Sequence, residues 1–199
     1  MIETLHDDEW VSLRRIVARE LGIHGYVYSH ETRCAGRIAV VMPFRMRETG
    51  LLVDDDVPEV VLEVLLREEV TPCWHTTEPQ LSGITGGWED GDDLGCLFTA
   101  IRELWEEAGY RVHPKDMVDL GTCRGTKSTD TVYFLWGVDL TDVEKTGDGS
   151  GDGSELEARA TNRWVLHTDV IEAVDPTAHV ARNRLMAWLV REFAGDDES

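Results

Sequence analysis

Apolar side chains recur with two different periods along this chain of 199 residues, and together they predict an α/β protein. Runs rich in β-branched and aromatic residues predict strands, whereas apolar positions three and four residues apart predict amphipathic helices. The predicted strands cover residues 26–28, 38–44, 60–66, 117–120, 131–138 and 156–165. The predicted helices cover about 7–21, 97–108 and 177–194. Alternating strands with covering helices are typical of an α/β/α sandwich around a mixed β-sheet.

The first predicted helix lies outside this sandwich. Asp7 and Asp8 precede its apolar positions and suit a helix N-terminus. We therefore predict an N-terminal helical extension over residues 1–35, containing the helix and one strand, followed by a domain over 36–195 and a disordered tail over 196–199. The apolar positions of this helix are Trp10, Leu13, Ile16, Val17 and Leu21.

Two further segments are predicted to be irregular. The acidic segment between Met46 and Pro58 is rich in turn formers and predicts a connector. Residues 146–154 read TGDGSGDGS, which predicts a flexible loop. A calcium-binding EF-hand is excluded there, because counting from Asp148 places Arg159 at the position that needs a bidentate glutamate.

Charge and cysteine content narrow the class of protein. The net charge of −20 argues against binding a nucleic-acid polymer through a basic surface, but it allows a small nucleotide that carries its own metal. No apolar run reaches the roughly 18 residues of a membrane span, so no membrane contact is expected. Four scattered cysteines with no CxxC pair and no secretory leader predict reduced thiols in a cytoplasmic protein. A zinc site from His30, Cys34, Cys73 and His75 is an alternative, but neither pair has a usual ligand spacing.

The helix over 97–108 carries the strongest chemical signal. Glu103, Glu106 and Glu107 stand at positions i, i+3 and i+4, which places three carboxylates on one helix face. Their mutual repulsion is relieved by a hard cation such as Mg²⁺, which prefers oxygen ligands. A solvated acidic face is the alternative for such a pattern alone. The glycine-rich loop at 86–93 leads into the helix, however, and its backbone N–H groups suit an anion, which favours phosphate chemistry.

These residues resemble the signature of the Nudix hydrolases, G-x5-E-x7-R-E-U-x-E-E-x-G-U, where U is a bulky aliphatic residue. The second half matches from Arg102 to Gly109, with Tyr110 in the last apolar place. The first half departs from it, because five residues after Gly87 stands Asp93 in place of glutamate, and eight residues rather than seven separate Asp93 from Arg102. The order of the flanking strands also resembles the Nudix sandwich.

The resemblance implies Mg²⁺-dependent hydrolysis of a nucleoside diphosphate linked to another group, with Mn²⁺ as a possible substitute. It assigns the metal to Glu103, Glu106 and Glu107, together with Gly87. Arg102 would hold a carboxylate in its rotamer, and Glu103 would also help to activate water. A catalytic glutamate after the loop at 146–154 would be Glu157 or Glu155. A homodimer that pairs through N-terminal strands is a further expectation.

The substrate is less well defined. The layout resembles the ADP-ribose and nucleotide-sugar branch of the family. Candidate substrate contacts are Arg37, Arg45 and Arg67, the loop residues Arg124 and Lys127, and, for stacking on a base, Trp74 or Trp88. The alternatives are hydrolysis of nucleoside triphosphates or dinucleotides, and a nucleotide sensor without catalysis, which the departure around Asp93 would suit.

Overall fold

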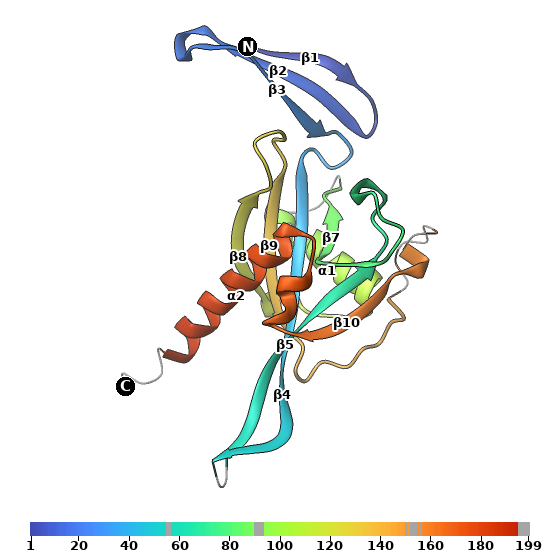
Figure 1. Ribbon diagram of the computed structural model, residues 1–199, viewed down its shortest axis with the longest axis vertical. Helices are drawn as coiled ribbons and strands as arrows, with labels where there is room; N and C mark the ends of the chain where they lie inside the picture. The colour runs from blue at the N-terminus through green and yellow to red at the C-terminus, as the bar shows by residue number, and fades with distance from the viewer. Residues whose placement is uncertain (55–56, 90–93, 150, 152–154, 156, 195–199) are drawn as a thin grey trace.

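The main body of the protein is one mixed β-sheet with a helix on each face, and a separate small sheet precedes it (Figure 1). This computed structural model describes residues 1–54, 57–89, 94–149, 151, 155 and 157–194. The five main strands run in the order β10 (Thr161–Leu166), β5 (Val57–Glu69), β4 (Arg37–Asp54), β9 (Val132–Asp139) and β8 (Met117–Arg124). Two short strands join them, β6 (Gln80–Ser82) on β5 and β7 (Ile84–Gly87) on β4.

The central strand β4 has the composition that its position requires. Residues 39–44 are all buried, because β4 is covered on both faces. On one face Val40 packs with Leu185 of α2 (Pro176–Ala194). On the other, Val41 packs with Leu104 at the end of α1 (Leu97–Glu103). The sheet therefore separates two apolar cores. The expected mixed sheet with two covering helices is present.

The strands β4 and β5 pair over only part of their length. Their antiparallel register runs from Phe44 opposite Val64 outward to Asp54 opposite Val57. On the other side of this point, β4 pairs with β7 and β5 pairs with β6. The two strands therefore separate within the sheet, and the segment from Gln80 to Gly87 follows both edges of the opening.

The N-terminal helix is wrong, because residues 1–31 form a three-stranded antiparallel sheet of β1 (Ile2–Asp7), β2 (Val11–Ala18) and β3 (Ile23–Glu31). Asp8 caps the turn between β1 and β2 instead of a helix, since its Oδ1 accepts hydrogen bonds at 2.8 Å from both the Val11 and Trp10 amides. The amide of Val11, the His6 side chain and the amide of Trp10 lower the pKa of Asp8 to about 2. The β-branched pair at 16–17 favours the strand, and cross-strand partners that no local pattern reveals outweigh the helical spacing.

The irregular connector predicted between Met46 and Pro58 is also wrong in its described part. Strands β4 and β5 continue through it as the two arms of a hairpin, with Arg47 opposite Val61 and Glu48 opposite Val60. The hairpin projects from the end of the molecule opposite the N-terminal sheet (Figure 1). Apolar side chains on this projection, such as Leu51 and Leu52, are exposed.

The remaining elements are short. The last strand begins at Thr161, later than expected, because a 3₁₀ turn precedes it. The 3₁₀ turns are η1 (Arg19–Leu21), η2 (Pro72–Trp74), η3 (Leu94–Cys96), η5 (Pro114–Asp116), η6 (Glu157–Arg159) and η7 (Asp169–Glu172). In the described part of the chain, no helix combines the length and apolar character needed to cross a bilayer. None of the four cysteines, all of which the structure describes, is joined to another in a disulfide.

Candidate active site

The acidic helix face is built from α1 and a π-helical turn that continues it, η4 (Leu104–Ala108). A π-helical turn widens the helix and is frequent at functional sites. The turn ends at Gly109, whose φ of 78° lies in the left-handed region that glycine adopts without strain. Apolar residues of the same segment, among them Ala100 and Leu104, face the core. The three glutamates therefore lie on a different face of the helical segment from these apolar residues.

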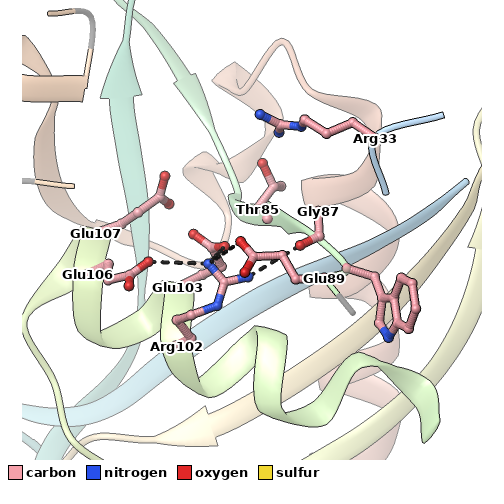
Figure 2. A pocket seen from close by; sticks show the side chains of 10 residues that line it. Arg33, Thr85, Gly87, Glu89, Arg102, Glu103, Glu106 and Glu107 are labelled. Atoms are coloured by element: carbon pink, nitrogen blue, oxygen red, sulfur yellow. Dashed lines mark hydrogen bonds and ion pairs between the residues drawn. The ribbon is translucent and has the colours of Figure 1, made fainter. Parts of the chain in front are cut away.

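Glu103, Glu106 and Glu107 come together in one cavity of about 150 Å³, which we call the acidic pocket (Figure 2). The helix supplies one wall, and β7 with the residues after it supplies another. The residues that line the acidic pocket are Arg33, Thr85, Gly86, Gly87, Trp88, Glu89, Arg102, Glu103, Glu106 and Glu107. The predicted constellation of Gly87, Arg102 and the three acids is thus assembled in space.

Arg102 stands at the centre of these carboxylates (Figure 2). Its Nη1 lies 2.9 Å from Glu103 Oε1 and 3.3 Å from oxygens of both Glu106 and Glu89. Its Nη2 donates a 3.3 Å hydrogen bond to the carbonyl of Gly87. One guanidinium group therefore joins the helix to the end of β7 and pairs with three carboxylates.

Gly86 allows Glu103 to lie against the sheet. A Cβ atom at Gly86 would overlap the carboxyl group of Glu103, which packs directly over the β7 backbone. Glu103 is consequently buried, with 9% of its surface exposed. The glycine at this position is required by close approach and not by a turn.

Glu107 is held from behind by a buried arginine. Arg67 on β5 is 1% exposed, and its Nε lies 3.5 Å from Glu107 Oε1. Its Nη1 donates to the backbone carbonyl of Glu107 at 3.1 Å, and Asn162 Nδ2 donates to the same oxygen at 2.5 Å. Arg67 was a candidate phosphate contact, but its guanidinium group is committed to Glu107 and to Glu69, whose Oε2 lies 3.2 Å away.

Arg33, which no sequence pattern had indicated, is the second arginine of the acidic pocket. It lies between β3 and β4, and Figure 2 shows it reaching in from the side opposite the helix. Its guanidinium carbon lies 5.6 Å from the ring centroid of Trp10, a cation–π distance. The N-terminal sheet therefore helps to place a positive charge across the cavity from the acids.

The other basic residues predicted to contact the substrate do not line the acidic pocket. Arg37 lies over the ring of Trp88 at 5.2 Å. Arg45 lies 4.1 Å from the ring centroid of Trp164 and pairs with Glu63 at 2.6 Å. Of the two candidate stacking residues, Trp88 lines the acidic pocket and Trp74 lines a different cavity.

Arg124 and Lys127 lie in a third, open groove beside Tyr26 of the N-terminal sheet. Arg124 donates to the carbonyl of Asp130 at 2.8 Å. Glu155 is exposed, and the backbone of Glu157 opens η6. The Glu157 side chain and the whole of Asp93 lie outside the described residues.

The described part of the loop at 146–154 packs on the end of the helix that carries the three glutamates. The amides of Thr146 and Gly147 donate to the carbonyl of Gly109 at 3.0 and 2.9 Å, and the amide of Gly151 donates to the carbonyl of Glu106 at 2.8 Å. A Cβ atom at Gly109 would lie 2.5 Å from the carbonyl oxygen of Gly147. Residues 146–149 and 151 form no helix or strand, as predicted for a loop, and their amides satisfy carbonyl groups that the helix end leaves open.

The donors of the acidic pocket suit a hard divalent cation, because every predicted side-chain ligand is a carboxylate and Gly87 can offer only a backbone carbonyl oxygen. The guanidinium group of Arg102 already places positive charge among three of the carboxylates. Within the described residues, no three His, Cys, Asp or Glu side chains are grouped closely enough to hold a metal ion. The four residues of the zinc alternative are therefore not grouped as a zinc site. Binding a metal would thus require Glu103 and Glu106 to turn from Arg102 toward Glu107.

Comparison with known proteins defines the class of fold. No family model matches the sequence, and no curated protein matches it. In the comparison with solved structures, 110 chains match this one. A shared fold does not by itself select a substrate. One of these structures is described as the crystal structure of an ADP compounds hydrolase. It matches with a TM-score of 0.66 and 16% identity, over 96% of this chain and 93% of that chain.

Proposed function

We propose that this protein is a Nudix-type hydrolase that uses Mg²⁺ or Mn²⁺ to cleave the pyrophosphate of a nucleoside diphosphate linked to another group, with ADP-ribose or a nucleotide sugar as substrate. The observation that carries the proposal is the acidic pocket, in which the motif residues Arg102, Glu103, Glu106 and Glu107 meet a second arginine, Arg33. The fold shared with an ADP compounds hydrolase supports it.

Opposite charges on the two sides of the pocket suit a metal-bound pyrophosphate. The metal would be held by Glu103, Glu106 and Glu107, and would neutralise developing charge and acidify bound water. Arg33 would contact phosphate oxygens from the opposite side, and Arg102 would orient the acids. Glu103 would accept a proton from the attacking water as the new P–O bond forms and the bridging P–O bond breaks, so that ADP-ribose and water yield AMP and ribose 5-phosphate.

The test is a panel of ADP-ribose, nucleotide sugars, dinucleoside polyphosphates and nucleoside triphosphates, each incubated with Mg²⁺ or Mn²⁺ and analysed by chromatography. Release of AMP and ribose 5-phosphate is expected. Cleavage of triphosphates alone would assign the alternative activity. Saturable nucleotide binding without turnover would favour the sensor.

Variants assign the ligands within this assay. Glu106→Gln and Glu107→Gln should each lower kcat about 100-fold or more with the fold retained, because each removes a charged ligand. Glu172→Gln, which changes an exposed acid in η7, is the matched control and should keep its rate. A wild-type rate for either pocket variant at limiting Mg²⁺ would contradict the ligand assignment.

A homodimer through the N-terminal sheet forms part of the proposal. Exposed apolar side chains on this sheet, including Ile2, Trp10 and Leu13, support it. Light scattering after size-exclusion chromatography should give twice the chain mass. A monomer at all concentrations would contradict the dimer without affecting the proposed hydrolysis.

A further inference from the structure

A second cavity of about 210 Å³ lies where β4 and β5 separate, next to the acidic pocket. Its lining comes from both edges of the opening, with Glu69 and Ser82 from β5 and β6, and Ile38 and Thr85 from β4 and β7. Thr85 lines both cavities. The two cavities are therefore neighbours, and a substrate whose charged part occupies the acidic pocket has this second cavity beside it. We call it the hydroxyl cavity, after the hydroxyl groups described next.

The lining is rich in groups that bind hydroxyls. Thr71, Ser82, Thr85 and Tyr133 contribute hydroxyl groups, while Trp74 contributes an aromatic wall. The Oγ1 atom of Thr71 is buried and has no hydrogen-bond partner among the described residues. Burial, followed by the charges of Glu31 and Asp175, raises the pKa of Tyr133, so its phenol stays protonated and can donate.

The charge of the hydroxyl cavity differs from that of the acidic pocket. Glu69 brings a carboxylate that already accepts from Ser82 Oγ at 3.2 Å and from Arg67 Nε at 3.2 Å. The second carboxylate, Asp175, accepts from the amide of Thr177 at 2.8 Å at the start of α2. No lysine or arginine is among the lining residues. An anionic group is disfavoured there, whereas a neutral ring that donates hydrogen bonds is favoured.

We propose that the hydroxyl cavity binds a neutral, hydroxyl-bearing ring of the substrate, the pentose or hexose on one side of the pyrophosphate. The inference rests on the proposed function and adds to it the site that recognises the sugar. Whole drug-sized ligands occupy about 300–1,000 Å³, so a cavity of about 210 Å³ suits a single ring. Trp74 packs against the apolar face of the sugar, and the hydroxyls of Thr71 and Tyr133 bind its edge.

A chain of contacts joins this cavity to the acids. Glu69 pairs with Arg67, and Arg67 in turn holds both the carboxylate and the carbonyl group of Glu107. A sugar hydroxyl that donates to Glu69 is therefore linked, through the buried guanidinium group of Arg67, to the proposed metal ligand Glu107. The same arrangement places the sugar and the pyrophosphate on the two sides of Thr85.

The experiment measures KM for ADP-ribose and the inhibition constant of ATP, which carries no second sugar, in Trp74→Ala, Trp74→Phe and Thr71→Val. Thr77→Val, in the exposed loop beyond η2, is the matched control for the threonine change. Trp74→Ala should raise KM for ADP-ribose about tenfold, and Thr71→Val about threefold, while the inhibition constant of ATP stays unchanged. Both constants should be unchanged in the control variant. Trp74→Phe should restore most of the affinity. An equal change for both nucleotides, or no change for either, would overturn the assignment.

A binding measurement separates this inference from the proposed hydrolysis. Calorimetric titration with ribose 5-phosphate, and with AMP as its comparison, requires no turnover. Weaker binding of ribose 5-phosphate to Trp74→Ala, with AMP unaffected, would support the hydroxyl cavity even in an inactive protein. Unchanged ribose 5-phosphate binding in an active enzyme would overturn the cavity assignment and leave the hydrolysis intact.

Discussion

Arg67 Nε lies 3.5 Å from Glu107 Oε1, and the same guanidinium group donates to the Glu107 backbone carbonyl at 3.1 Å. Both side chains are buried. A proposed metal ligand is thus positioned by a residue on another element, 40 positions away in the chain. Such pairs are sensitive to the loss of one partner, because the remaining charge stays out of water.

Arg67→Met should therefore lower the free energy of unfolding by about 3 kcal/mol, since Glu107 and Glu69 would lose a common cation. Urea denaturation followed by circular dichroism measures this. The control is Arg163→Met, which removes a 3.9 Å pair with Glu68 on the half-exposed edge and should cost less than about 1 kcal/mol. Equal losses would show that Arg67 contributes no more than a surface arginine.

Gly86→Ala should disable the site and preserve the sheet. The added methyl group would overlap Glu103 and displace its carboxylate, and misplacement of a catalytic group by an ångström can lower kcat about 100-fold. Steady-state kinetics with thermal melting test this. In the control Gly137→Ala, the new Cβ meets its nearest neighbour at 3.4 Å, an ordinary contact, so the rate should be kept. Full activity in Gly86→Ala would mean that Glu103 need not lie where it does.

Arg33→Ala should raise KM about tenfold and change kcat less, because the arginine faces the pocket from the side opposite the acids and is proposed to bind phosphate. Arg33→Lys should restore part of the affinity, since the charge remains and the fork geometry is lost. Arg19→Ala, at an exposed position of η1, is the control. If KM were the same in all variants, Arg33 would have no role in binding.

Glu63 should make the fold sensitive to acid. Burial alone raises the pKa of this carboxyl group, but hydrogen bonds and charge from Arg47 and Arg45 outweigh it and hold the pKa below the ordinary 4.5. A pKa that is lower in the folded state stabilises the protein above the unfolded pKa, and this stabilisation disappears as the pH falls through the folded value. Stability should therefore decline as the pH falls below about 4.5.

Glu63→Gln isolates that contribution. The variant should lose about 2 kcal/mol at neutral pH, the size expected for charge-assisted hydrogen bonds, and should differ little from the wild type at the acid end. Urea midpoints between pH 7 and pH 3 give the comparison. Parallel curves for the two proteins would assign the acid sensitivity to other groups.

Local sequence patterns predicted those parts of the fold whose environment matches their composition. Residues 39–44 form a continuous apolar run because both faces of β4 are covered, and α2 has the helical period that a covering helix requires. The same reasoning fails at 7–21, where the pairing of Ile16 with Ile2 and Tyr26 decides the structure. A helical spacing of apolar residues in that segment is compatible with strands once partners exist.

The residues of the candidate site also divide into those that local sequence predicts and those that it does not. Glu103, Glu106 and Glu107 could be grouped from spacing alone, because they share one short helical segment. The residues that surround them could not, since Asn162 meets Glu107 across 55 positions and Arg33 arrives from the turn after β3. An isolated arginine has no local signal that distinguishes a pocket from a surface.

The contact between the loop at 146–154 and the helix end also affects the order in which parts of the protein can fold during synthesis. A nascent chain emerges from its N-terminus, so all three acids leave the ribosome before Thr146, Gly147 and Gly151 are available to bond the carbonyls of Gly109 and Glu106. Until then the acidic end of the helix has neither this loop nor Asn162. The acidic pocket should consequently be among the last parts of the protein to become ordered during translation.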